Sequence, residues 1–208
     1  MADDRAGPNG AASTATAPSA VRRLDSAEAV ELAGLAAVFE DLQYVLRCCE
    51  HLVSALATPE PDSALVEALW TGALVGYVRC FSARTAVLSD ADLTELKLDG
   101  DVAEFHGMIK KLRDHYASRH ANPRESFSIG ASQANDGRPT GVAVVSTPRP
   151  LVDDITVRLL GRVAYALSGL LDARMQATQA RVLESAGGLS PTELSRLPLL
   201  HLADSAAG

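Results

Sequence analysis

Basic side chains and histidines gather in one short stretch of the chain, between His106 and Glu125. The stretch holds two acids, Asp114 and Glu125, against five basic residues, so its formal charge is +3 while the rest of the chain carries −10. A basic stretch in an acidic protein indicates a site for an anion such as a phosphate group. The basic residues are Lys110, Lys111, Arg113, Arg119 and Arg124, and the histidines are His106, His115 and His120.

The spacing of three of these residues predicts a shared helix face. His106, Arg113 and His120 are seven residues apart in succession. Seven residues turn an α-helix by about 700°, so each side chain lies only about 20° from the previous one. Ile109 and Tyr116 fall on another face, which we expect to point toward the core. Arg113 and His120 would stand roughly 10 Å apart along the axis, and their long side chains could converge on one substrate.

These residue types suit the cleavage of RNA without a metal ion. A histidine can take the proton of a ribose 2′-hydroxyl or protonate the leaving oxygen, because its pKa lies near neutrality. An arginine can hold a phosphate group through two hydrogen bonds and stabilise its growing charge. We therefore expect Arg113 and His120 to be catalytic. The expected RNA-binding residues are Lys110, Lys111, Arg119, Asn122 and Arg124, and the supporting polar residues are Asp114, His106 and His115.

A structural role is the alternative for every one of these residues. A basic helix end with histidines is often only a solvated face, and this interpretation is favoured for His106 and His115. The separations of nine and five residues between the three histidines do not suit one helix face, so the sequence predicts no metal site and no cofactor.

The segment Arg113-Asp114-His115-Tyr116-Ala117-Ser118-Arg119-His120 resembles the Arg-polar-x-His signature of the HEPN superfamily. In that superfamily four to six residues separate the arginine from the histidine, and a polar residue often follows the arginine. The resemblance implies a metal-independent endoribonuclease or RNA-binding domain in a helical bundle. It also implies a homodimer in which two motifs face each other, and a place in toxin–antitoxin or phage-defence systems, with an antitoxin as a protein partner.

Two other functions stay open from the sequence. The first is a non-catalytic helical interaction module whose basic stretch meets an acidic partner. The second is a bundle that binds a small molecule or has a regulatory role.

Composition narrows the class of protein. The chain has 208 residues, of which 47% are hydrophobic and only 4% aromatic, so a core of Leu, Val and Ala and a mainly helical fold are expected. The net charge of −7 gives no global attraction to nucleic acid or to anionic membranes. The apolar run 64–78 is too short to span a bilayer. Three cysteines, with no apolar leader segment at the N-terminus, indicate free thiols in a reducing, cytoplasmic setting.

The pattern of apolar residues predicts an antiparallel bundle of four to five helices. Long helices are expected over 24–57, 63–86, 101–120 and 151–185, with a helical turn at 90–96 between the second and the third. Gly72 and Gly76, four residues apart on the second helix, would let another helix approach closely. That second helix is apolar on nearly all sides, which also favours a homodimer.

The period of the pattern changes after the third long helix. Residues 126–130 and 141–147 alternate or are rich in β-branched side chains, and Asn135-Asp136-Gly137 lies between them, which predicts a β-hairpin over 126–147. We expect a disordered arm at 1–20, the bundle domain at 21–188, and a short tail helix with the C-terminal tail at 189–208. Ser190-Pro191-Thr192-Glu193 is typical of the start of that tail helix.

Overall fold

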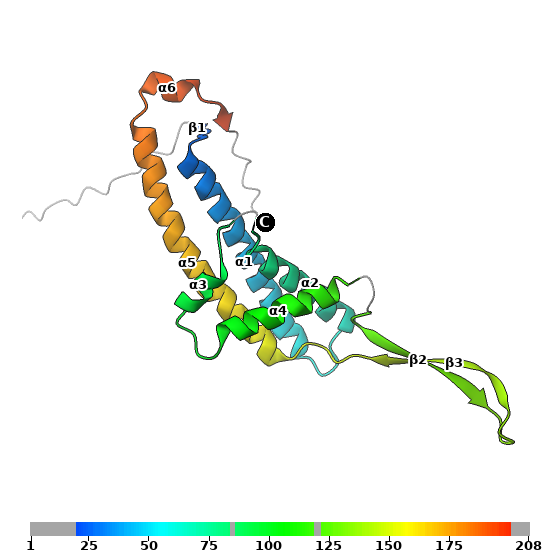
Figure 1. Cartoon of the computed structure of the whole chain (residues 1–208). Helices are drawn as coiled ribbons and strands as arrows, with labels where there is room; N and C mark the ends of the chain where they lie inside the picture. Colours follow the sequence, from blue (N-terminus) through cyan, green and yellow to red (C-terminus); the bar gives the residue numbers. More distant parts are fainter. Residues whose placement is uncertain (1–19, 84–85, 119–121, 201–208) are drawn as a thin grey trace, which may run out of the picture.

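The computed structural model describes residues 20–83, 86–118 and 122–200, and the chain in these ranges is mainly helical (Figure 1). The predicted mainly helical class is therefore confirmed. The described helices are α1 (Ala27–Leu56), α2 (Ser63–Arg79), α3 (Asp90–Glu95), α4 (Val102–Tyr116), α5 (Asp154–Gly187) and α6 (Pro191–Arg196). The described strands are β1 (Val21–Arg22), β2 (Glu125–Gln133), β3 (Pro139–Pro148) and β4 (Leu199–Leu200).

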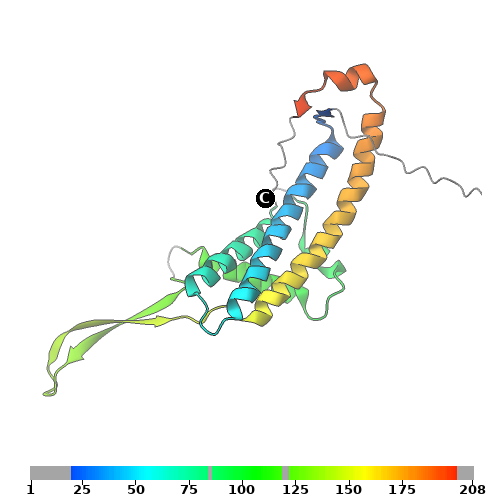
Figure 2. The same ribbon diagram turned by 180° about the vertical axis from the view of Figure 1, so that it is seen from behind.

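The two longest helices, α1 and α5, run side by side in both views of the molecule (Figures 1 and 2). Helix α2 packs on α1, and α4 packs on α2. The largest completely buried side chains come from all four of these helices, so one apolar core holds them together. They include Leu42 and Leu52 of α1, Trp70, Leu74 and Tyr77 of α2, Ile109 of α4, and Leu160, Leu167 and Leu171 of α5.

Side chains cap the starts of the helices. Ser26 accepts a hydrogen bond from Ala29 N at the start of α1, and Asp62 accepts from Ala64 N and Leu65 N at the start of α2. Ser190 and Glu193 form a capping box around the first turn of α6. Each cap satisfies backbone donors that have no partner inside the helix.

The paired glycines of α2 allow the close approach that their spacing predicts. A Cβ atom at Gly72 would lie 2.6 Å from the Tyr44 hydroxyl oxygen of α1, and one at Gly76 would lie 3.1 Å from Val45 Cγ2. Tyr44 can lie across α2 because glycine, which has no Cβ atom, occupies positions 72 and 76. The two glycines therefore set the distance between α1 and α2.

Two predicted helix ends are wrong. Helix α2 ends at Arg79 instead of residue 86, because short hydrogen-bonded turns follow it. After these turns the centroid of the Phe81 ring lies 4.4 Å from the centroid of the His106 ring. Helix α4 ends at Tyr116 instead of His120, and Ala117 already has a non-helical ψ near 0°. Cys80 and Phe81 continue the apolar pattern past the end of α2, so the pattern could not mark that end.

Strands β2 and β3 form an antiparallel hairpin that extends away from the helices in both views (Figures 1 and 2). Gly137 has a φ of +85° in the turn, a conformation that favours glycine, and its N–H donates to Ala134 O. Strands β1 and β4 pair Val21 with Leu200 and Arg22 with Leu199, which holds the two ends of the described chain together. Residues 1–19 of the arm expected at 1–20 lie outside the described residues.

Cys48, Cys49 and Cys80 are free and buried, as expected for small core residues. Burial raises the pKa of Cys49 and of Cys80 to about 12, so both groups are thiols at neutral pH. Within the described ranges, no helix combines the length and the apolar character needed to cross a membrane.

Candidate functional site at the end of helix α4

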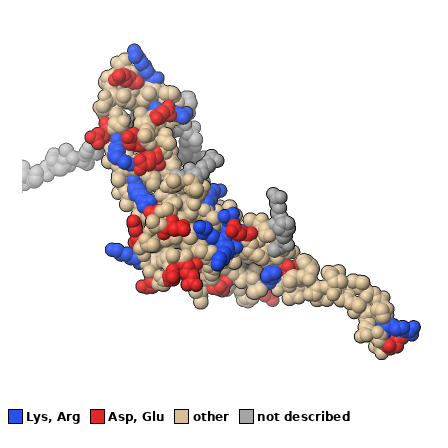
Figure 3. All heavy atoms as spheres, viewed as in Figure 1, with Lys and Arg blue, Asp and Glu red and all other residues tan. Residues whose placement is uncertain are grey.

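Helix α4 carries the predicted site and is anchored from one side. Asp101 caps it by accepting from Glu104 N, and Phe105 and Ile109 are buried in the core. Lys110 and Lys111 are exposed on the opposite side. In Figure 3, Lys and Arg side chains gather over α4, next to a few acidic atoms. The helix therefore presents a basic surface to solvent near its C-terminal end.

Arg113 lies at the boundary between this surface and the core. Its side chain is 39% exposed, and its Nη1 lies 3.3 Å from Asp114 Oδ1. Its Nε is enclosed and has no hydrogen-bond partner in the described part of the chain. In the described part of the chain the exposed Asp114 binds only one of the Arg113 nitrogens, so outer guanidinium donors remain available to an anion.

The second half of the predicted pair lies outside the described residues. His120 and Arg119 fall in the gap at 119–121, so the structure places Arg113 without placing its predicted partner. His115 is half-buried, and its ring meets the ring of Tyr116 edge-on, with the centroids 6.1 Å apart.

The predicted RNA-binding residues that follow the gap have partners within the protein. Asn122 Oδ1 accepts hydrogen bonds from Arg124 N at 2.9 Å and Glu125 N at 3.3 Å, and so forms the turn that starts β2. Arg124 Nη1 lies 3.1 Å from Oε1 of Glu67 on α2. The Asn122 side chain therefore fixes the loop before β2, and the Arg124 side chain attaches the base of the hairpin to α2.

His106 lies in the core, away from the solvent-exposed surface of α4. Tyr77 OH lies 3.0 Å from its Nδ1, Asp90 Oδ1 lies 3.4 Å from its Nε2, and the ring of Phe81 packs against it. Burial lowers the pKa of His106, and the carboxylate of Asp90 partly opposes this effect. Burial also raises the pKa of Tyr77. The His106 ring is thus neutral at neutral pH, and its Nδ1 is hydrogen-bonded inside the core.

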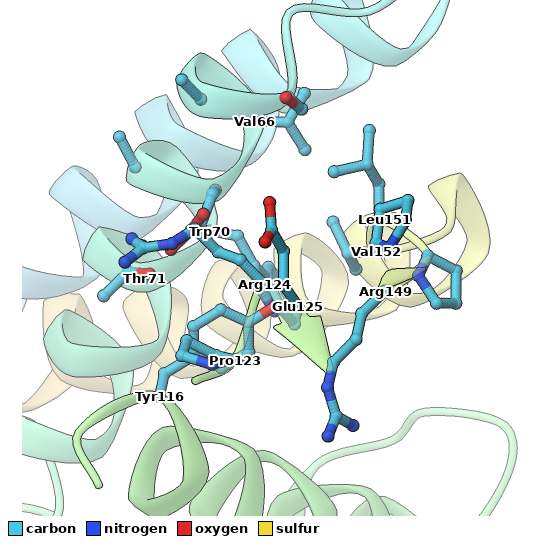
Figure 4. Close-up of a pocket in the computed structure, with 16 residues that line it drawn as sticks. Val66, Trp70, Thr71, Tyr116, Pro123, Arg124, Glu125, Arg149, Leu151 and Val152 are labelled. Atoms are coloured by element: carbon cyan, nitrogen blue, oxygen red, sulfur yellow. Dashed lines mark hydrogen bonds and ion pairs between the residues drawn. The ribbon is translucent and has the colours of Figure 1, made fainter. Parts of the chain in front are cut away.

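A cavity of about 510 Å³ lies between α2, the last turn of α4 and the base of the hairpin (Figure 4). Trp70, Tyr116, Leu151 and Val152 supply apolar walls. The charged lining residues are Glu67, Arg124, Glu125 and Arg149. Burial raises the pKa of Tyr116, and the nearby Glu67 acts in the same direction. The cavity combines segments far apart in the chain, so no local sequence pattern predicts it.

Among the described residues, no group of three or more His, Cys, Asp or Glu side chains could hold a metal ion. Neither a family model, nor a curated protein, nor a solved structure matches the chain.

Proposed function

We propose that this chain is an RNA-binding domain of the HEPN type with metal-independent endoribonuclease activity at the C-terminal end of α4. The observation that carries the proposal is the position of Arg113. Its guanidinium is partly exposed near the exposed Lys110 and Lys111, and Asp114, the one acidic residue that pairs with it among the described residues, is itself 68% exposed. Such a group can bind a phosphate without first breaking a buried ion pair.

In the proposed reaction Arg113 holds the scissile phosphate and neutralises its developing charge. His120, seven residues further along the chain, acts as the general acid or base. The lysines supply attraction to the RNA backbone that the net acidic chain otherwise lacks. Cleavage proceeds through attack of the 2′-oxygen on the phosphorus, which expels the 5′-oxygen of the next nucleotide and leaves a 2′,3′-cyclic phosphate.

The resemblance to the HEPN superfamily extends the proposal to a homodimer. It also suggests a role in a toxin–antitoxin system, with an antitoxin as the protein partner, or in phage defence. The buried, free thiols support a cytoplasmic location, because reducing compartments keep cysteines in this form.

The test uses the purified full-length chain and a mixed-sequence single-stranded RNA, with EDTA present throughout. We expect cleavage by the wild-type chain, and none by Arg113→Ala or by His120→Ala. Arg113→Lys should restore little activity, because lysine lacks the planar fork that grips two phosphate oxygens. Arg158→Ala and His115→Ala are the controls, and both should keep most of the activity.

Cleavage that persists in the double variant Arg113→Ala, His120→Ala would show that the site lies elsewhere. Ends other than 2′,3′-cyclic phosphate would contradict the mechanism.

A second candidate function is a non-catalytic interaction module. It is favoured by the hairpin, whose large apolar side chains are exposed although the helices already have a closed core. An intact fold with no binding to any RNA, together with specific binding to a protein, would favour this function over the first.

A further inference from the structure

The hairpin has one apolar face and one face of mostly small and polar residues, on which Val145 is the one large apolar side chain. Cross-strand pairing places Phe127 opposite Ser146, Ile129 opposite Val144, and Ala131 opposite Val142, and these pairs share one face. The other face pairs Ser126 with Thr147, Ser128 with Val145, Gly130 with Ala143, and Ser132 with Gly141. We call the face that carries Ile129 and Val144 the apolar hairpin face.

No described part of the chain covers the apolar hairpin face. Phe127 is 55% exposed, Ile129 68%, Val142 75% and Val144 67%. In the described residues β2 and β3 pair only with each other, so their outer edges also lack neighbours. A lone two-stranded hairpin is only marginally stable in water, and a further packed layer is what normally stabilises it. The exposed face therefore calls for a partner surface.

The charges of the hairpin exclude two classes of partner. Residues 126–135 and 139–148 contain no Asp, Glu, Lys or Arg, and in Figure 3 the hairpin is free of charged atoms between its base and its tip. A nucleic-acid partner needs basic side chains along the contact, and here there are none. Insertion into a bilayer would carry Asp136 and Arg138, at the tip, into the hydrocarbon. The partner surface is therefore a protein.

We propose that the apolar hairpin face docks on the same face of a second copy of this chain, with the two hairpins antiparallel about a twofold axis near Ile129 and Val144. A twofold axis at the middle of the strands requires the base and the turn to be equally far from it, and the hairpin meets this requirement. Ile129 stands four residues after the charged base at Glu125 and four before the turn that begins after Gln133. Each half therefore spans about 14 Å of strand.

In the antiparallel arrangement uncharged segments meet uncharged segments, and charged ends meet charged ends. The uncharged central segment of one hairpin lies on that of the other. The tip residues Asp136 and Arg138 come beside the partner's charged base residues, Arg124, Glu125 and Arg149. Each tip and each base carries both signs of charge, and within one chain Asp136 pairs with Arg138 and Arg124 pairs with Glu67, so neither end of the interface brings only like charges together. A twofold interface requires this kind of self-complementary pattern.

The area is consistent with a dimer that also uses the hairpin tips. The four large side chains expose on the order of 400 Å² of apolar surface per copy, the size at which exposed patches mark interaction sites. Two such faces bury on the order of 800 Å², so contact of each tip with the partner's helices is needed to reach the roughly 1,200 Å² of a stable interface. This surface is distinct from the end of α4, and the inference does not depend on RNA cleavage.

The first experiment measures the oligomeric state of the full-length chain by sedimentation at micromolar concentrations. We expect a dimer for the wild type and a weakening of on the order of 100-fold or more for Ile129→Asp, Val144→Asp, because unpaired carboxylates would be buried at the centre of the interface. The matched control is Ser128→Asp, Ser132→Asp on the opposite face, which should remain dimeric. The substituted positions are exposed in the single chain, so circular dichroism should show the same helical fold for all three proteins.

The second experiment locates the contact with a short bismaleimide cross-linker. Ile129→Cys should give covalent dimers, and Ser128→Cys should not. The native thiols are buried and should give no product in the wild type. A monomeric wild type, a dimer that survives Ile129→Asp, Val144→Asp, or equal cross-linking at positions 128 and 129 would overturn the proposal. Specific capture of a different protein by this face in place of a second copy would overturn it as well.

Discussion

The hydroxyl oxygen of Tyr77 lies 3.0 Å from Nδ1 of His106, and this buried hydrogen bond joins α2 to α4. Because Nε2 of the ring faces the carboxylate of Asp90, we infer that Nε2 carries the proton and that Tyr77 donates to Nδ1. Protonation of Nδ1 would remove this acceptor and make the ring a donor, so the tyrosine hydroxyl would have to reverse its role in the bond. The contact between the two helices therefore depends on pH.

We predict that the free energy of unfolding decreases as the pH falls below about 6.5, the ordinary pKa of histidine. Burial lowers the pKa of His106 in the folded chain, so the unfolded chain binds this proton first. The stabilisation is complete above the unfolded pKa and is lost progressively as the pH falls from there to the folded pKa. Urea unfolding at a series of pH values measures the effect.

The control for this measurement is His51→Gln, because His51 is exposed on α1. It should keep the pH dependence of the wild type, whereas His106→Gln should be less stable and show a shallower slope below neutrality. Equal slopes for the wild type and His106→Gln would contradict the assignment.

Tyr77→Phe should destabilise the fold by about 1–3 kcal/mol, because it leaves the buried Nδ1 of His106 without a donor. Tyr165→Phe is the matched control, since Tyr165 is 74% exposed on α5 and should change the free energy of unfolding very little. Chemical denaturation at pH 8 compares the two variants. A Tyr77→Phe protein as stable as the control would show that the hydrogen bond contributes nothing.

Gly76→Val should destabilise the fold by about 1–3 kcal/mol through overpacking, because even a Cβ at this position lies 3.1 Å from Val45 Cγ2 and 3.2 Å from Tyr44 Cδ1. The Cβ atom added by Gly107→Ala in α4 has no neighbour within 4 Å, so this substitution should stabilise the helix by about 0.5–1 kcal/mol. Thermal unfolding of both variants, followed by circular dichroism, gives the comparison. The prediction fails if both substitutions shift the melting temperature in the same direction.

If the end of α4 binds RNA, Lys110→Ala, Lys111→Ala should weaken binding about equally for all RNA sequences. The slope of log affinity against log salt concentration should become shallower by about 1.4, the value for two lost contacts with a single strand. Fluorescence anisotropy with a labelled RNA measures the slope. Arg138→Ala at the hairpin tip removes an exposed charge far along the chain from α4, and an equal change in that variant would argue against a local site.

The sequence by itself predicted the helical class, most of the helix starts and the change to alternating residues after α4. These features depend on neighbours in the chain. Ser26, Asp62 and Ser190 cap helices through contacts within three residues, and Gly72 and Gly76 share a face because of helical periodicity alone.

The tertiary structure alone decided which side chains of the basic segment are available. His106 and Arg113 share a face by spacing, yet His106 is enclosed by residues of α2 and of the segments around it, whereas Arg113 lies at the edge of that packing and reaches solvent. Burial, the pairing of Arg124 with Glu67, and the cavity at the base of the hairpin all depend on residues distant in the chain. The pattern of residues along the chain does not indicate which distant residues come into contact, so only the three-dimensional packing could establish these features.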